Sequence, residues 1–92
     1  MKRYRFTVTG RVQGVAFRYT ARDEATVLGL SGWVRNRPDG SVEGEFQGHD
    51  AACAKMLLWL EKGPPAARVE RLATSEIPPL DQDAGFSIRP TG

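Results

Sequence analysis

Two segments with the apolar spacing of an α-helix stand between segments that alternate like β-strands. This order constrains the possible folds more than any other feature of the chain. Between residues 17 and 28, and again between 53 and 60, apolar side chains recur every three or four positions. Such a stripe covers one face of a helix, so each helix needs an apolar surface to pack against. The stripes consist of Phe17, Ala21, Ala25 and Leu28, and of Cys53, Met56, Leu57 and Leu60.

Strand-like alternation precedes, separates and follows these two stripes. Apolar and polar residues alternate in residues 3–9 and 41–47, more loosely in 69–73, and again in the short segment 86–88. Residues 31–37, which contain Trp33 and Val34, are expected to form a further strand. Alternation of this kind is typical of strands with one buried and one solvated face. The sequence therefore predicts four strands and a short closing strand.

Local signals mark where these elements end. Pro38-Asp39-Gly40 is a strong turn sequence, which predicts a hairpin between the second and third strands. Gly29 stands where a helix C-cap belongs, and Gly63-Pro64-Pro65 ends the second helix. Asp50 is the expected N-cap of that helix. In the fourth strand we expect a bulge near Leu72.

The order strand, helix, strand, strand, helix, strand favours one architecture. Two amphipathic helices cannot bury their stripes on each other and also cover the apolar face of a sheet. Placing both helices on one face of an antiparallel sheet solves this, and right-handed crossovers close the topology. The sequence therefore predicts an α+β fold, the ferredoxin-like split βαβ sandwich (βαββαβ), in a single domain spanning residues 1–92.

Composition excludes several classes of protein. The 13 basic and 11 acidic residues give a formal net charge of +2, which is too balanced to predict polyanion binding over the whole surface. No apolar run is long enough to span a membrane, and the residues after Met1 do not form a signal peptide. Cys53 is the only cysteine, so no internal disulfide can form. We expect a cytoplasmic monomer with no nucleic-acid or membrane partner.

The segment from Gly10 to Arg18, where the first strand gives way to the first helix, predicts a site for a phosphoryl or similar oxyanion. Backbone N–H groups of a short glycine-containing loop can converge on an anion, and the N-terminus of the following helix adds to the attraction. The guanidinium of Arg18 matches two phosphate oxygens at once. The alternative is an ordinary tight turn followed by a solvated arginine. The candidate binding residues are Gln13, Gly14, Val15, Ala16, Phe17 and Arg18.

Asn36 is the second candidate, at the end of the second strand just before the turn. By alternation it shares a face with Val34, the residue expected to face the helices, so it can approach the loop that opens the first helix. A carboxamide there can accept a hydrogen bond from water and donate one to a phosphate oxygen. The alternative is an asparagine that satisfies backbone groups beside the turn, and the pattern supports both equally.

Few side chains of this chain suit acid–base or metal chemistry. His49 has no cysteine or carboxylate at ligand spacing, and Cys53 and Phe17 are expected in the core. Glu43 and Glu45 are expected on the solvated face of the third strand. We therefore expect no metal and no cofactor. Backbone amides, an arginine and an asparagine can orient water and stabilise charge, which suits a phosphate with an acidic leaving group, such as the carboxylate of a carboxyl-phosphate anhydride.

Several segments together closely resemble the acylphosphatases. The likeness covers essentially the whole chain and is most specific in the loop and in the Trp-Val-Arg-Asn segment. The segments that carry it are Gly10–Arg18, Leu28–Asn36, Asp39–Glu43, Trp59-Leu60 before Gly63-Pro64, Ala67–Val69 and Phe86–Ile88.

This resemblance implies a small enzyme that hydrolyses acyl phosphates to a carboxylate and inorganic phosphate, without a metal or cofactor. Arg18 would bind the phosphoryl group, Asn36 would position the attacking water, and the amides of Gln13 through Arg18 would complete the phosphate cradle. Ala16 stands where many relatives carry glycine, and an alanine should fit there if its φ is negative.

Two other classes of function share this architecture. An RNA-recognition domain has the same fold, but Glu43 and Glu45 would place negative charge on its open sheet face. A related domain could also bind an anion or a partner without catalysis, or form one piece of a larger carbamoyl-phosphate-processing protein. Arg35 and Arg37 are expected to be solvated strand residues, with capture of anionic substrates as the alternative.

Overall fold

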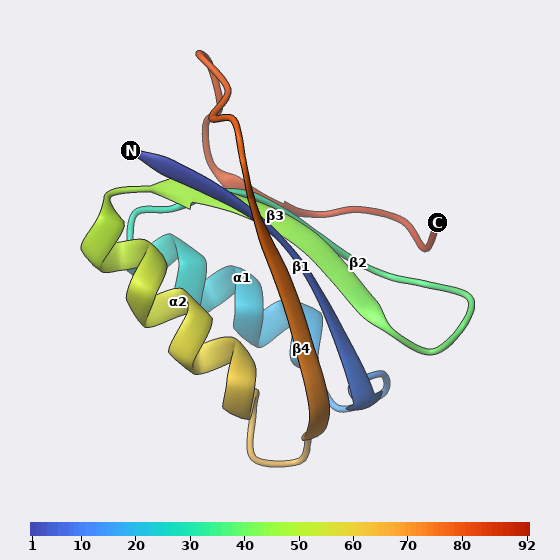
Figure 1. Ribbon diagram of the computed structural model, residues 1–92. Coiled ribbons are helices and arrows are strands. Elements are labelled where there is room, and N and C mark those ends of the chain that lie inside the picture. The colour runs from blue at the N-terminus through green and yellow to red at the C-terminus, as the bar shows by residue number, and fades with distance from the viewer.

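The computed structural model describes residues 1–92 and contains two helices and five strands, in the predicted order. Figure 1 shows the sheet with both helices packed against the same face. The elements are β1 (Lys2–Arg11), α1 (Phe17–Val27), β2 (Ser31–Asn36), β3 (Val42–Gly48), α2 (Asp50–Lys62), β4 (Arg68–Ile77) and β5 (Phe86–Ile88).

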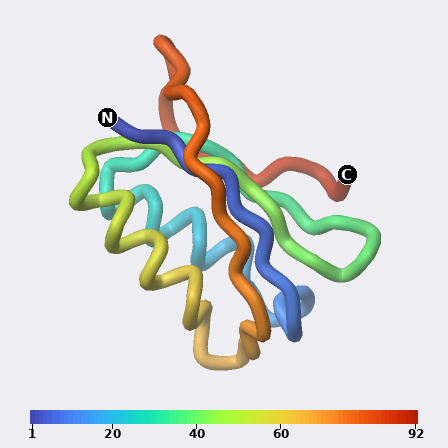
Figure 2. Tube along the Cα trace, viewed as in Figure 1, coloured from blue at the N-terminus to red at the C-terminus, as the bar shows by residue number.

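The strands form one sheet in the order β4-β1-β3-β2-β5. The pairs β1·β3, β1·β4 and β2·β3 are antiparallel, as predicted, but β2 and β5 are parallel. The prediction of a purely antiparallel sheet is therefore wrong at this edge. The reason is topological, because β4 runs opposite to β2 and residues 78–85 reverse the chain before β5. The Cα trace shows this segment projecting beyond the sheet before the C-terminal segment turns back (Figure 2).

The core lies between the sheet and the helices. Phe17, Ala21 and Ala25 are the buried residues of α1, while Cys53, Met56 and Leu60 are those of α2. Both predicted stripes are thus confirmed, although Leu28 and Leu57 are only partly buried. Burying each large apolar side chain stabilises the fold by about 2 kcal/mol. The sheet supplies Phe6, Val8, Val34, Val42 and Phe46 to this core.

The opposite face of the sheet is closed by charged side chains. Glu43 is only 2% exposed. Its carboxylate lies 3.5, 2.6 and 3.4 Å from the guanidinium nitrogens of Arg5, Arg35 and Arg37. The prediction of a solvated Glu43 is therefore wrong: arginines from the neighbouring strands and the hairpin turn cover it. Arg35 and Arg37 are correspondingly partners of this carboxylate rather than freely solvated.

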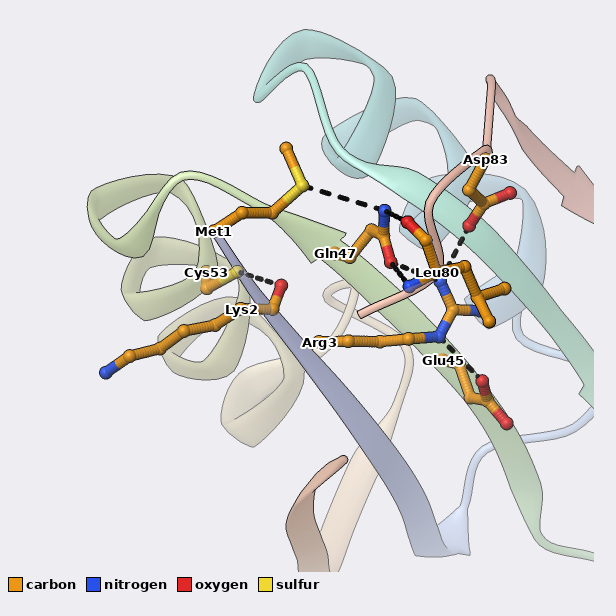
Figure 3. Close-up of polar contacts among 8 residues, drawn as sticks. All are labelled: Met1, Lys2, Arg3, Glu45, Gln47, Cys53, Leu80 and Asp83. Atoms are coloured by element: carbon orange, nitrogen blue, oxygen red, sulfur yellow. Dashed lines mark hydrogen bonds and ion pairs between the residues drawn. The ribbon is translucent and has the colours of Figure 1, made fainter. Parts of the chain in front are cut away.

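Arg3 is buried on the same outer face and holds the 78–85 segment to the sheet (Figure 3). Its guanidinium donates to Glu45 at 2.8 Å, Gln47 at 3.0 Å and Asp83 at 2.7 Å. Burial by itself lowers the pKa of Arg3, but the hydrogen bonds to Asp83 and Glu45 outweigh it and raise that pKa. Glu45 is therefore also largely covered, in contrast to the prediction.

Two predicted details at element ends need correction. Asp50 is the first residue of α2, and His49 is its N-cap without a side-chain hydrogen bond. Asp50 still suits this position, because a carboxylate in the first turn complements the helix dipole. The bulge lies at Glu70 rather than near Leu72, since Thr9 pairs with Arg71 and Gly10 with Val69. The predicted stops hold, with α1 ending before Gly29 and α2 before Gly63.

Candidate active site

The loop between β1 and α1 is built on two residues with left-handed backbone. Gly14 has a φ of 73°, and Ala16 has a φ of 62° and a ψ of 23°. The negative φ at which an alanine was expected to fit is therefore not the one that Ala16 adopts. The chain must turn from the strand into the helix within this loop while Val15 and Phe17 enter the core. For a residue with a Cβ, the left-handed region costs about 1–2 kcal/mol, so the loop stores strain at Ala16.

The backbone N–H groups of this loop have no hydrogen-bond partners in the protein. None of the amides from Gln13 through Tyr19 donates to a backbone or side-chain acceptor. Helix α1 has no side-chain N-cap and no acidic residue in its first turn. The orphan amides of any helix N-terminus attract anions, and here the preceding loop adds further donors. The segment is therefore able to donate several hydrogen bonds to one oxyanion.

Arg18 lies in the first turn of α1, beside these amides. It is half-exposed and has no carboxylate within ion-pair distance, although its guanidinium carbon lies 5.5 Å from the centre of the Tyr19 ring. Its neighbour Phe17 is 1% exposed and packs against Trp59 at 5.4 Å between ring centroids. Phe17 is thus a core residue, as predicted, and it anchors the start of the helix that carries Arg18.

Gln13 links the loop to the β2–β3 hairpin. Its side-chain amide donates to the carbonyl oxygens of Arg37 at 2.8 Å and Ser41 at 2.9 Å. From the sequence, only the backbone amide of Gln13 was expected to contribute, so these side-chain hydrogen bonds to the hairpin were not predicted. The hairpin turn is itself fixed by Asp39, whose carboxylate accepts hydrogen bonds from the hydroxyl and amide of Ser41. These bonds lower the pKa of Asp39.

Asn36 is the last residue of β2, immediately before the carbonyl that Gln13 binds. Its Oδ1 is buried without a hydrogen-bond partner, and no other buried side-chain nitrogen or oxygen in the molecule shares this property. The backbone of Asn36 is held in register with Val42 and accepts a hydrogen bond from the Gly92 amide at 3.2 Å. A buried acceptor without a partner costs stability, so such an atom in a native protein is expected to have a reason, such as a bound water or a functional role.

The tie from Gln13 places the loop and the Asn36 end of the hairpin next to each other. Arg18 lies five residues beyond Gln13, in the first turn of α1, and no hydrogen bond joins its side chain to Asn36. Outside this region, His49 is exposed and Cys53 is buried, with burial raising the pKa of its thiol. No three His, Cys, Asp or Glu side chains lie close enough to hold a metal ion. The donor set at the loop is suited to anions and water.

Comparison with known proteins decides the family. The acylphosphatase family model matches residues 4–88. The chain belongs to the acylphosphatase family. It is 49% identical over 87 residues to the acylphosphatase of Anaeromyxobacter dehalogenans, covering 95% of this chain and 94% of that one. It is 55% identical over 76 residues to the acylphosphatase of Thiobacillus denitrificans, covering 83% and 85%.

Solved acylphosphatase structures share the whole fold. The enzyme from Bacillus subtilis superposes with a TM-score of 0.92 at 39% identity, over 97% of this chain and 99% of that one. Acylphosphatases hydrolyse acyl phosphates, and this chain is an enzyme of that type. Neither of its helices is long and apolar enough to cross a membrane.

Proposed function

We propose that the enzyme cleaves the carboxyl-phosphate bond through a water positioned by Asn36, while the phosphoryl group is held by Arg18 and the loop amides. The observation that carries this proposal is that two segments joined by the Gln13 side chain both carry polar groups without hydrogen-bond partners. The loop carries backbone N–H donors without acceptors, and the end of β2 carries the Oδ1 of Asn36 without a donor. Donors suit the phosphoryl oxygens and the acceptor suits a water hydrogen.

In this mechanism the water oxygen attacks phosphorus in line with the departing carboxylate oxygen. The Oδ1 of Asn36 accepts a hydrogen bond from the water and so fixes the direction of its lone pair. As the new P–O bond forms, the P–O bond to the acyl group breaks and its electron pair leaves with the carboxylate. One hydrogen of the water stays in the new P–OH group, and the other passes to a phosphoryl oxygen of the inorganic phosphate, from which it can ionise to solvent. The amides of Gln13 through Arg18 and the Arg18 guanidinium stabilise the charge on the equatorial oxygens.

The substrate class follows from the absence of a proton donor in this constellation. Neither Arg18 nor an amide can readily protonate an alkoxide as it leaves, whereas a carboxylate leaves without protonation. Acyl phosphates are therefore the expected substrates, and ordinary phosphate monoesters are expected to be poor ones. The proposed steps use Arg18, Asn36 and backbone amides, and none of these steps calls for a metal ion.

The test is hydrolysis of benzoyl phosphate in the presence of EDTA by the wild-type enzyme and by Asn36→Ala. We expect metal-independent turnover that falls by about two to three orders of magnitude in the variant, as for other residues that orient a reacting group. Phosphate should still protect Asn36→Ala from unfolding, because its loop is intact. An exposed control, His49→Ala, should keep full activity.

Two results would contradict the proposal. If Asn36→Ala retained wild-type turnover, the water would be positioned elsewhere. If the wild-type protein bound phosphate but hydrolysed no acyl phosphate, the loop would belong to an anion-binding module of the same fold.

A further inference from the structure

A cluster of Arg18, Tyr19 and Arg22 on the first turns of α1 is used only in part by this mechanism. Tyr19 projects from the first turn of α1 and is 52% exposed. The guanidinium carbons of Arg18 and Arg22 lie 5.5 and 5.6 Å from the centre of its ring, respectively. One exposed aromatic ring thus holds two guanidinium groups, of which only Arg18 has a role in the proposed hydrolysis.

Arg22 is one helical turn beyond Arg18, so the two side chains emerge from the same face of α1. Both guanidinium carbons lie near the same ring, so their separation cannot exceed about 11 Å, the limit set by the two ring distances. A short dicarboxylate chain can bridge a gap of this size, since each guanidinium also reaches toward its own anion. The second cation is therefore within reach of a substrate whose phosphoryl group is bound at Arg18.

The charge on Arg22 is weakly compensated. Its one carboxylate neighbour is Asp23, whose Oδ1 lies 3.3 Å from Nε. The two side chains are 42% and 68% exposed and adjacent in sequence, and such exposed pairs contribute little. The remaining nitrogens of the Arg22 guanidinium have no partner among the hydrogen bonds of the structure. By contrast, Arg35 is held on Glu43 by two short contacts.

We propose that Tyr19 and Arg22 form a subsite for the acyl half of the substrate, which favours acyl groups carrying a second negative charge. This inference rests on the proposed placement of the phosphoryl group at Arg18. The carboxylate at the far end of a dicarboxylic acyl phosphate pairs with Arg22, and the apolar chain between the two anions lies along the exposed Tyr19 ring. Arg22 acts here as a binding residue and takes no part in bond breaking.

The experiment compares acetyl phosphate with succinyl phosphate, whose acyl group is longer by one methylene and ends in a carboxylate. We expect Arg22→Gln to lower kcat/KM for succinyl phosphate by about fivefold, in line with an exposed charge pair. For acetyl phosphate, kcat/KM should stay within about twofold of the wild-type value. Glutamine favours helix, so the variant should fold normally.

Two further variants separate this subsite from general attraction of anions. Arg71→Gln removes the same charge from exposed β4 and should leave the succinyl-to-acetyl ratio unchanged. Asp23→Asn frees Arg22 from its carboxylate neighbour and should raise that ratio.

The possible failures are distinguishable. No hydrolysis of acetyl phosphate by the wild-type enzyme would refute the proposed function itself. Hydrolysis of both substrates, with the same ratio in wild type and Arg22→Gln, would overturn the subsite and leave the proposed function standing. Equal losses in Arg22→Gln and Arg71→Gln would also overturn it, because they would assign the effect to long-range charge.

Discussion

The outer face of the sheet and the loop before α1 use the same kinds of polar group in opposite ways. On the outer face, Arg3 contacts Glu45, Gln47 and Asp83, and Glu43 is surrounded by three arginines. At the loop, Arg18 has no carboxylate partner. The difference indicates that the arginines of the outer face are used to close the surface, whereas Arg18, which also stands beside backbone amides without acceptors, is available to bind an anion.

The backbone groups of the two regions also differ in whether they have hydrogen-bond partners within the protein. The side chain of Gln47 donates to the Leu80 carbonyl at 3.1 Å and accepts from the Leu80 amide at 2.9 Å. Both backbone groups of Leu80, in the 78–85 segment, therefore have partners within the protein. The amides from Gln13 through Tyr19 have no such acceptor. In a molecule that otherwise satisfies its buried polar side chains, the loop and Asn36 together stand out as the place prepared for a ligand.

The largest expected effects come from replacing Arg18, which has no carboxylate partner, and Arg3, which has two. The first replacement should affect activity and the second stability. Arg18→Ala should reduce turnover of benzoyl phosphate by about a thousandfold or more, as for other arginines that stabilise a transferring phosphoryl group, and should abolish protection by phosphate. The stability of Arg18→Ala should change little, because the substitution leaves no carboxylate without its cation.

Arg3→Met should instead lower the free energy of unfolding by about 2 kcal/mol, since Glu45 and Asp83 lose their shared cation. Denaturant titrations and kinetics on both variants check this.

The contrast between the two regions would be contradicted if Arg3→Met affected activity rather than stability, or if Arg18→Ala still bound phosphate. Loss of activity without loss of stability in Arg3→Met would mean that the outer face takes part in catalysis. Persistent phosphate protection in Arg18→Ala would mean that the anion is bound elsewhere.

Gln13→Leu should have an intermediate effect. It removes the two hydrogen bonds to the hairpin, but both hairpin carbonyls keep another donor. The Arg37 carbonyl still accepts from the Gly40 amide at 3.1 Å, and the Ser41 carbonyl from the Arg37 amide at 2.8 Å. We therefore expect a loss of about 1 kcal/mol in stability, the usual size for side-chain hydrogen bonds. The kcat should fall by about tenfold while phosphate affinity changes less, because Asn36 and the loop lose their alignment.

The exposed Gln82→Leu variant is the matched control for Gln13→Leu and should behave as wild type. An unchanged kcat in Gln13→Leu would show that the loop and the hairpin are aligned without this tie.

Ala16→Gly should have the smallest effect. Glycine adopts a φ of 62° without strain, which favours the variant, but it also gains freedom in the unfolded chain. We expect a net gain of about 0.5 kcal/mol in the free energy of unfolding, measured by denaturant titration. A clear loss of stability would contradict the strain assigned to this alanine.

Most predictions that rested on local pattern were accurate, although the N-cap of α2 is His49 rather than Asp50. The alternation of Tyr4, Phe6 and Val8, the apolar stripes of both helices and the Pro38-Asp39-Gly40 turn gave the elements and their order. Periodicity reports which residues share a face, and that depends only on the backbone conformation of the segment itself. The roles of Arg18 and Asn36 came from the same local signals and from family resemblance, and they remain proposals to be tested.

The larger failures were predictions that depended on distant partners. Glu43 and Glu45 lie on the predicted face, but their burial is set by arginines from other segments. The direction of β5 depends on where the preceding loop delivers the chain, and the positive φ of Ala16 on the close connection between β1 and α1. No periodicity within one segment carries this information.

The sequence by itself determined the succession of strands and helices, the apolar core and the loop with its arginine. Only the tertiary structure decided which polar groups found partners. It joined Gln13 to the carbonyls of the hairpin, covered Glu43 with three arginines, and left the loop amides and the Oδ1 of Asn36 without acceptor or donor. The physical reason is that hydrogen bonds and ion pairs between remote segments form only when packing of the core brings those segments together.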